Sequence, residues 1–317
     1  MSFSSDVKEE LERRSSGAKH CQIAELAGLL AFSGKVRRAR GGSWQLLFTT
    51  ENRSARTAYM ELLGKAFAIG EDKLSVEKEG RRVYTVRLAD EALARRVLMA
   101  IKWMDPKTGK IEPVFVHDIL IQREDDRKAF LRGAFLAAGS LTDPRKQYHM
   151  EIVCSYAADA KKMTEIFWFF HIDARTVRRK NSTVVYIKEA GQITDALNLM
   201  GAVVSQMDLT NVVIYKEVRN EVNRKVNCET ANSNKTAVAA VRQIKAIEKI
   251  RDTIGLESLT PQLRDIAQAR LENPELDLRS LGQTLDPPVG KSGVNHRLRR
   301  LIEIAESGTT ADDGKEE

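Results

Sequence analysis

The chain has 317 residues, of which 42% are hydrophobic and 30% charged, and a net charge of +7, a composition typical of about two soluble domains. Its three cysteines match no zinc-binding spacing, and no apolar run approaches the roughly 20 residues of a membrane-spanning helix. These features predict a cytoplasmic protein with no membrane segment, metal site or cofactor, and the basic charge favours a polyanionic partner.

The first part of the chain is predicted to alternate helices with hairpins. Residues 1–20 are expected to contribute an amphipathic helix, with Val7 and Leu11 on one side. Gly-containing pairs at 41–42 and 79–80 separate β-prone runs, as in hairpins. The elements predicted next are a helix at 23–34, strands at 35–40 and 44–50, a helix from Asn52 to Phe67, strands at 74–78 and 82–88, and a helix at 89–103.

After a linker marked by Pro106, Gly109 and Pro113, a similar order of elements returns. We therefore expect one domain over residues 21–204, with halves of about 21–105 and 120–204. The elements predicted in the second half are a helix at 124–139, a strand at 148–154, a helix at 157–169, strands at 174–179 and 183–188, and a helix at 193–200.

A nine-residue pattern occurs in each half, as LAGLLAFSG from Leu26 and, 105 residues later, as LRGAFLAAG from Leu131. Gly28 and Gly133 hold matching places in the two copies. Because Gly inside a helix costs roughly 1 kcal/mol relative to Ala, matched glycines indicate that the two helices pack closely. The pattern resembles the LAGLIDADG motif of homing endonucleases, which implies a pseudo-twofold domain with these helices at its centre.

In that family each motif helix places an acidic residue before its final glycine, at paired metal sites. Here these positions hold Ser33 and Ala138. Glu25 lies roughly 12 Å from Ser33 along a helix that rises ~1.5 Å per residue, and Asp143 has no partner in the first half. Because cleavage of a phosphodiester needs carboxylates to hold the cations, we expect no catalytic residues and no enzymatic activity.

Two predicted hairpins are rich in basic residues and are interpreted as counterparts of each other. In homing endonucleases such strands line a saddle over DNA, so a DNA-binding surface is one interpretation. An exposed polar sheet face is an equal alternative. The candidate contacts are Lys35, Arg37, Arg38 and Arg40 in the first hairpin, and Arg175, Arg178, Arg179 and Lys180 in the second.

A protein-binding scaffold is a further alternative, with RNA polymerase or another regulator as the partner. Trp168, Phe169 and Phe170 could supply an aromatic patch for it. A place in the hydrophobic core is the favoured interpretation of such a cluster.

Residues 205–255 are predicted to form a helical connector, because their valines and isoleucines keep helical spacing. Four asparagines lie between Asn220 and Asn232. Since Asn is a mediocre helix former, a break or kink is expected near Asn232.

Residues 256–307 are predicted to form three short helices, at 261–272, 277–285 and 292–305, and 308–317 a disordered acidic tail. Three helices with a basic last helix resemble a helix-turn-helix, whose last helix enters the major groove. A helical bundle with a solvated basic face is the alternative. Asn and Arg are side chains that read base edges, which favours DNA binding. The candidate contacts are Lys291, Ser292, Asn295, His296, Arg297, Arg299 and Arg300.

Taken together, the degenerate motif pair, the Asn-rich connector and the C-terminal helices resemble the bacterial WhiA family over essentially the whole chain. The most specific segments are NCETAN at 227–232, Asp286-Pro287-Pro288 and KSGVNHRL at 291–298. The resemblance implies an α+β fold in which a LAGLIDADG homing-endonuclease-like domain precedes an all-α helix-turn-helix domain. It also implies a nucleoid-associated transcriptional regulator of sporulation or cell division that binds double-stranded DNA.

Overall fold

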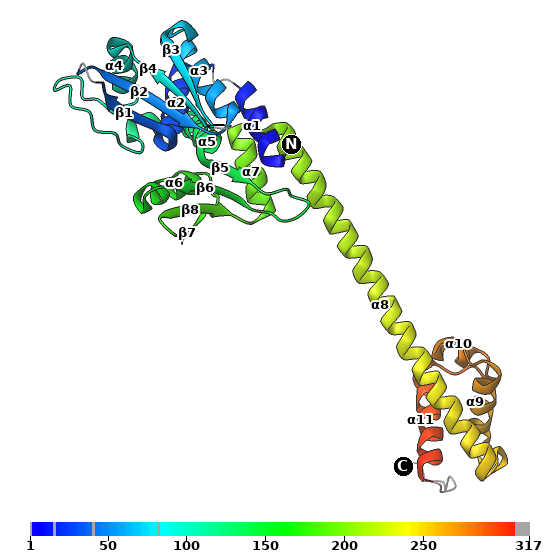
Figure 1. The fold of residues 1–317 in the computed structure, drawn as a ribbon. Helices are drawn as coiled ribbons and strands as arrows, with labels where there is room; N and C mark the ends of the chain where they lie inside the picture. Colours follow the sequence, from blue (N-terminus) through cyan, green and yellow to red (C-terminus); the bar gives the residue numbers. More distant parts are fainter. Residues whose placement is uncertain (1, 15–16, 40–41, 81–82, 308–317) are drawn as a thin grey trace. The chain divides into compact units, whose positions relative to one another are not determined.

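The computed structural model describes residues 2–14, 17–39, 42–80 and 83–307, so Arg40 and the tail after Ser307 lie outside the described residues. The chain forms two compact units, Met1–Lys216 and Glu217–Glu317. Figure 1 shows strands and helices in the first unit and helices in the second. The α+β fold class expected from the sequence is confirmed.

The first unit begins with helix α1 (Phe3–Arg13), which buries Val7 and Leu11 as predicted. Local signals set several boundaries. The Asn52 side chain, for example, accepts a hydrogen bond from the Ala55 backbone N–H at 3.0 Å and caps α3. The other elements of the first half are α2 (Lys19–Ser33), β1 (Gly34–Arg38), β2 (Trp44–Thr50), α3 (Arg53–Phe67), β3 (Leu74–Glu79), β4 (Val83–Leu88) and α4 (Glu91–Ala100).

The second half repeats this arrangement and contains one strand that the sequence did not predict. Strand β5 pairs its Gly139 with Ile152 of β6, and at three residues it is too short to show an alternating pattern. The elements of this half are α5 (Glu124–Ala138), β5 (Gly139–Leu141), β6 (Met150–Cys154), α6 (Ala157–Phe169), β7 (Arg175–Arg179), β8 (Ser182–Ile187) and α7 (Ala190–Met200).

Each half holds a four-stranded antiparallel sheet, ordered β1-β2-β4-β3 in the first and β5-β6-β8-β7 in the second. The matching orders give the unit its pseudo-twofold arrangement. They also make β5 the equivalent of β1, and β7 the equivalent of β3, in the second half. The prediction that the two basic hairpins are counterparts is therefore wrong, because β1 and β7 stand at non-equivalent edges.

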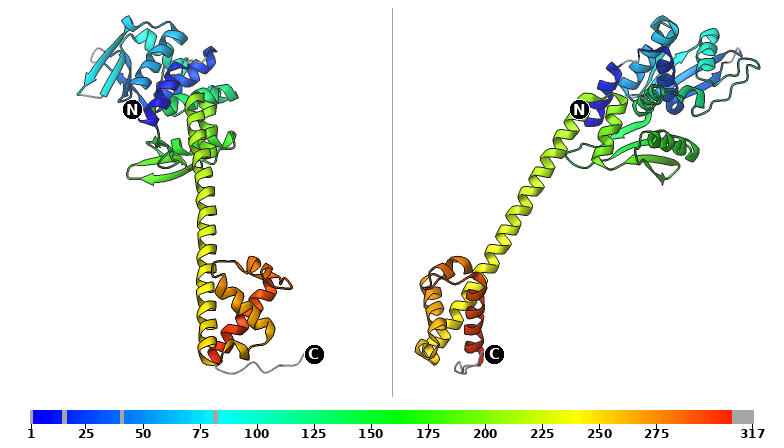
Figure 2. Two further views of the ribbon diagram at one scale, coloured as in Figure 1. Left: turned by 90° about the vertical axis from the view of Figure 1, so that its right-hand side faces the viewer. Right: turned by 180° about the vertical axis from the view of Figure 1, so that it is seen from behind.

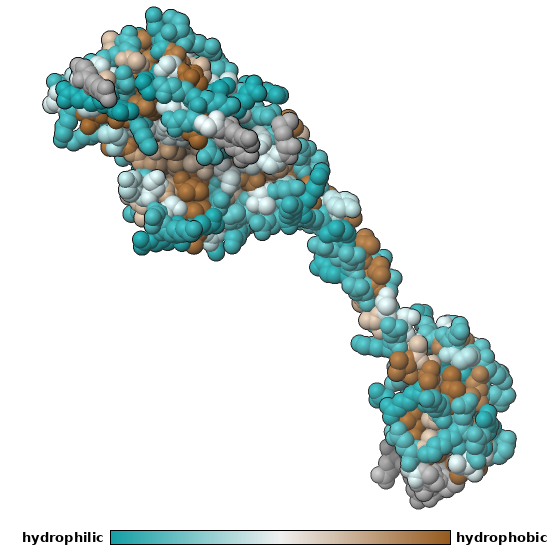
Figure 3. Space-filling model, viewed as in Figure 1, coloured by the Kyte–Doolittle hydropathy of each residue, from teal (hydrophilic) through white to brown (hydrophobic). Residues whose placement is uncertain are grey.

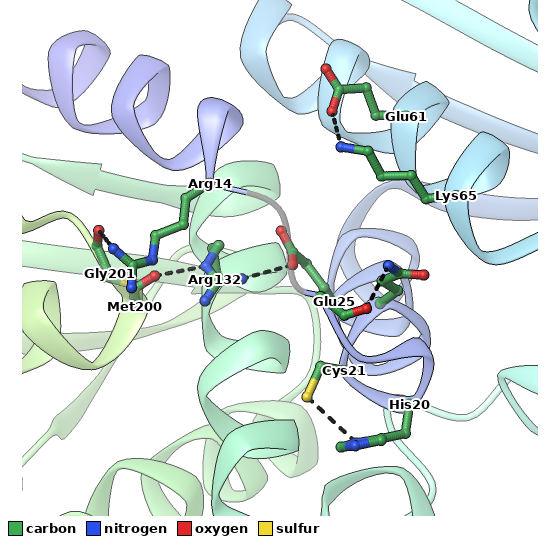
Figure 4. Close-up of polar contacts among 11 residues, drawn as sticks. Arg14, His20, Cys21, Glu25, Glu61, Lys65, Arg132, Met200 and Gly201 are labelled. Carbon is green, nitrogen blue, oxygen red and sulfur yellow. Dashed lines mark hydrogen bonds and ion pairs between the residues drawn. The ribbon is translucent and has the colours of Figure 1, made fainter.

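The two motif helices α2 and α5 pack directly on each other, and we call this contact the seam. A Cβ atom at Gly28 would collide with the Phe130 carbonyl oxygen, and one at Gly133 with the Glu25 carbonyl oxygen. The predicted close approach at these glycines is thus confirmed. Figure 4 shows Glu25 and Arg132 facing each other across the seam. Their ion pair is 2.8 Å long and buried.

Helix α8 (Val203–Thr253) is 51 residues long and contributes to both units. It passes through Asn232 without interruption, so the expected break there is wrong, because the intrinsic penalty of Asn is only a fraction of a kcal/mol per residue. Val218, Val222 and Val226 keep their helical spacing but are more than half exposed. Figure 3 shows apolar surface along this helix.

The second unit packs three helices beside the C-terminal part of α8 (Figure 2). They are α9 (Pro261–Glu272), α10 (Leu278–Gln283) and α11 (Lys291–Ser307). Ile247 of α8, Ile266 of α9 and Leu298 of α11 meet in its core. Arg270 is 1% exposed, and its guanidinium donates to the Leu276 carbonyl at 2.7 Å, which ties α9 to the loop before α10.

Candidate nucleic-acid interface

Helix α11 presents one apolar and one polar face. Val294, Leu298 and Leu301 are buried, and because a helix advances about 100° per residue, their spacing turns the remaining side chains away from the core. The exposed side chains of its first three turns are Lys291, Ser292, His296, Arg299 and Arg300, whereas Asn295 and Arg297 are half-buried.

The turn before α11 is held close to α10. The Val289 N–H donates to the Gly282 carbonyl at 2.9 Å, and a Cβ at Gly282 would collide with the Val289 carbonyl oxygen. Only glycine leaves room for this contact. The backbone therefore fixes where α11 begins and which face it presents.

Helix α8 borders the same polar face, which the sequence analysis did not predict. Asn295 and Arg299 of α11 line a groove together with Asn234, Lys235 and Arg242 of α8. Lys291 and Asn295 line a neighbouring hollow with Asn232. The Asn-rich run of the connector thus contributes polar side chains beside the last helix, and its proximity could not be read from spacing alone.

Charge on α11 is graded from its first turn to its last. No Asp or Glu occurs between Lys291 and Ile302. The acidic residues that follow Ile302 are paired: Glu303 with Arg300 at 3.2 Å, and Glu306 with Arg242 of α8 at 2.9 Å. The beginning of α11 therefore contains basic residues and no acidic residue of its own, while Asp277 before α10 lines the same hollow as Lys291. A helix N-terminus itself favours anions.

The first basic strand presents Lys35 and Arg37 on the open face of its sheet. Side chains alternate along a strand, and the intervening Val36 packs against the core. Among the described residues neither Lys35 nor Arg37 forms an ion pair with a carboxylate. Arg38 instead stacks 5.5 Å from the ring centre of Trp44 and donates to the Gly42 carbonyl at 2.9 Å.

The second basic strand is partly neutralised. Arg175 pairs with Asp173 at 3.0 Å and Arg179 with Glu151 at 3.3 Å. Arg178 alternates with them and points to the other face of the strand. Lys180 lies in the hairpin turn with a φ of 54°. The structure therefore does not bring the four predicted residues of this hairpin onto one surface.

The C-terminal end of the seam is where the acidic residues of a homing endonuclease would stand. Ser33 and Ala138 are the last residues of α2 and α5. Lys8, Ser33 and Glu51 line one open hollow there, so Glu51 places a carboxylate that the sequence analysis did not consider. The buried Lys8 ammonium donates to the Leu136 carbonyl at 3.0 Å and adds a positive charge at this end.

Family models match two consecutive parts of the chain. The model described as the WhiA LAGLIDADG-like domain matches residues 127–219, and that of the WhiA C-terminal HTH domain matches residues 222–305. A protein named probable cell division protein WhiA from Lachnospira eligens is 51% identical over 308 residues, covering 96% of this chain and 97% of its own. This chain belongs to the WhiA family.

Further relatives agree over the same length. A probable cell division protein WhiA from Thermoanaerobacter pseudethanolicus is 41% identical over 311 residues, covering 96% of this chain and 97% of its own. The crystal structure of full-length DUF199/WhiA from Thermatoga maritima is 30% identical, with a TM-score of 0.59, and covers 99% of this chain and all of that chain. The WhiA HTH model begins at residue 222, so it includes the part of α8 that borders α11.

Helix α6 carries an exposed aromatic group. Trp168 is 73% exposed and Phe169 48% exposed, and Phe169 stacks under Arg127 at 3.7 Å. The expectation of a place in the core is wrong for Trp168 and Phe169, because Ile166 and Phe167 fill the buried face of α6 instead. Phe170 is partly buried and packs against the core. Over the described residues, no helix has an apolar stretch long enough to cross a bilayer.

Lys8 is expected to make stability depend on pH. Burial lowers the pKa of its ammonium from 10.5 to about 8, whereas the unfolded chain keeps this proton up to pH 10.5. Between these values the unfolded state binds more protons, so the free energy of unfolding rises with pH. Relative to Lys8→Met, the wild type should gain about 3 kcal/mol from pH 8 to pH 10.5.

Urea unfolding of both proteins at the two pH values measures this difference. The variant lacks the hydrogen bond to Leu136 at both pH values. Loss of this bond therefore does not contribute to the pH-dependent difference in the free energy of unfolding. Parallel pH profiles for the wild type and Lys8→Met would contradict a buried, destabilising charge at this end of the seam.

Proposed function

We propose that this protein is a sequence-specific transcriptional regulator that binds double-stranded DNA through α11 and is associated with the nucleoid. One observation carries the proposal: the first three turns of α11 expose Ser292, His296 and Arg299 and contain no acidic residue. Side chains of these kinds hydrogen-bond to base edges, and the N-terminal residues of a recognition helix are those that reach them. The match to an HTH family model supports the same assignment.

The residues of α8 extend this surface toward the phosphates. Lys235 and Asn234 line the groove beside Arg299, and Lys and Asn side chains are common phosphate contacts. We infer that α11 reads bases while Lys291 and Lys235 position the helix on the backbone. Lys35 and Arg37 on the first sheet are further candidate contacts, and the paired Arg175 and Arg179 are weaker ones.

We further propose that the LAGLIDADG-like domain does not cleave DNA. Ser33 and Ala138 offer no carboxylate at the ends of the motif helices, and Lys8 lines the hollow beside Ser33. A lysine there repels the divalent cations that phosphodiester cleavage requires. Glu51 alone provides too few oxygen ligands to replace two motif carboxylates.

Binding isotherms of the full chain test the proposal, using a sequence selected from random DNA and a scrambled version of it. Arg299→Ala should reduce discrimination by about 1–3 kcal/mol and relax the choice at one base position. Lys291→Ala should weaken both DNAs alike and lower the salt slope by about one unit. Neither side chain contributes to the core of the unit, so both variants should fold.

Arg251→Ala is the matched control, because Arg251 is exposed and pairs with Asp252 on α8 rather than lining this groove. It should leave both isotherms unchanged. Equal affinity of the wild type for the selected and scrambled DNA would contradict the proposal, and cutting of either DNA in Mg²⁺ or Mn²⁺ by the purified protein would overturn its second part.

A second candidate function is a platform for another protein, such as RNA polymerase or a WhiB-like regulator. The exposed side chain of Trp168 favours it, since large exposed aromatic residues are enriched in protein interfaces. Failure of the wild type to prefer any DNA sequence would favour this function instead.

A further inference from the structure

Four metal-ligating side chains meet at the N-terminal end of the seam, the end opposite Ser33 and Ala138. His20 Nδ1 lies 2.5 Å from the Asp126 carboxylate and 3.4 Å from Cys21 Sγ. Ligand atoms of His20, Cys21 and Asp125 all lie within 4.8 Å of one another. Figure 4 shows Cys21 and His20 side by side at the start of α2.

The cluster follows the internal repeat of the chain. Two adjacent side chains come from the first turn of α2, and the other two, Asp125 and Asp126, come from the first turn of α5. The offset of 105 residues that relates the two motifs also relates His20 to Asp125 and Cys21 to Asp126. The pseudo-twofold arrangement therefore brings one pair of ligands from each half to a single point, where spacing within either half alone gives no signal.

The surroundings resemble a binding site more than a chance surface group. Cys21 is 7% exposed and packs against Ala24 and Ala129, and Asp126 is 4% exposed. Small neighbours leave the thiol close to the carboxylates. The side chains of His20 and Asp125 are 40% and 53% exposed, which provides a route for an ion. Arg123, at 3.6 Å from Asp125, is the cation that faces this carboxylate.

We propose that these four residues bind a zinc ion that joins the beginnings of the two motif helices. A thiolate, an imidazole and two carboxylate oxygens form a mixed tetrahedral ligand set that suits Zn²⁺, whereas Mg²⁺ and Ca²⁺ prefer oxygen alone. On binding, the ion displaces two protons to solvent, one from the Cys21 thiol and one from between His20 and Asp126. It also offsets the negative charge of the carboxylates. The site is independent of the DNA-binding surface proposed for α11.

The test uses the full chain, without a polyhistidine tag, stripped with a chelator and then given a limited amount of Zn²⁺ or Co²⁺. We expect one tightly bound metal ion per chain by elemental analysis. We also expect a sulfur-to-cobalt charge-transfer band. Asp126→Asn should lower metal affinity by at least about 10–100-fold, the loss found even for residues that only support a metal-bound histidine. Cys21→Ser should abolish the charge-transfer band.

Cys228→Ser is the matched control, because Cys228 is an exposed thiol on α8 outside the cluster. It should keep the metal content and the spectrum of the wild type. Asp125→Asn changes an exposed carboxylate and so tests the site even if the buried variants misfold. It should reduce metal affinity while leaving the circular dichroism spectrum unchanged. A metal-free wild type after loading, or a charge-transfer band that survives Cys21→Ser and disappears in Cys228→Ser, would overturn the proposal.

Discussion

Replacing Gly133 by alanine is expected to lower the free energy of unfolding by about 3 kcal/mol, near the upper end of the range for overpacked interiors. The added methyl group would collide with the Glu25 carbonyl oxygen and lie 3.0 Å from the Leu29 nitrogen. These are backbone atoms of the facing helix, so relief requires α2 and α5 to separate. Because the seam joins the two halves of the domain, separation would loosen contacts on both sides.

Gly191→Ala is the control for this prediction. Gly191 also lies in a helix, but a Cβ built on it meets no other atom within 4 Å. Ala is the better helix former, so this change should be neutral or stabilise by about 0.5–1 kcal/mol. Urea unfolding, followed by circular dichroism, compares the two. Equal midpoints for Gly133→Ala and the wild type would contradict the close packing of the seam.

Several features of the fold could be predicted because each depends on residues close together in the sequence. Asn52 caps α3 through a side chain three residues away, and glycines between β-prone runs mark hairpins. The buried stripe of α11 follows from the spacing of Val294, Leu298 and Leu301. Repetition of the motif placed both Gly28 and Gly133 at the contact between α2 and α5, since two similar halves pack through equivalent surfaces.

Features that depend on contacts between distant segments could not be predicted in this way. Strand β5 exists because Gly139 pairs with Ile152, and three residues show no alternation of their own. The groove beside Arg299 requires α11 to return alongside α8. Arg178 and Arg179 are neighbours in β7 but face opposite sides of the strand. The number of basic residues in the strand is therefore larger than the number that share one surface. Trp168 is exposed because its neighbour Phe167 takes the buried position of the same turn.

Removal of one partner of the buried ion pair in the seam is expected to have the largest effect on stability. The Arg132 guanidinium lies 2.8 Å from the Glu25 carboxylate and donates to the Met200 carbonyl at 2.7 Å. The two side chains are 9% and 3% exposed. Arg132→Met would leave the Glu25 carboxylate buried without this guanidinium, a change that typically costs about 3–5 kcal/mol. The Met200 carbonyl, at the C-terminal end of α7, would lose a charged donor as well.

A double variant separates the cost of an isolated charge from the value of the pair itself. Glu25→Leu together with Arg132→Met removes both charges and keeps the volume nearly filled, so most of the lost stability should return. The exposed pair Glu61–Lys65, also 2.8 Å long, is the control, and Lys65→Met should change stability by no more than about 0.5 kcal/mol. Figure 4 shows both pairs. Equal losses for Arg132→Met and the double variant would mean that packing of the arginine stem, rather than its charge, stabilises the seam.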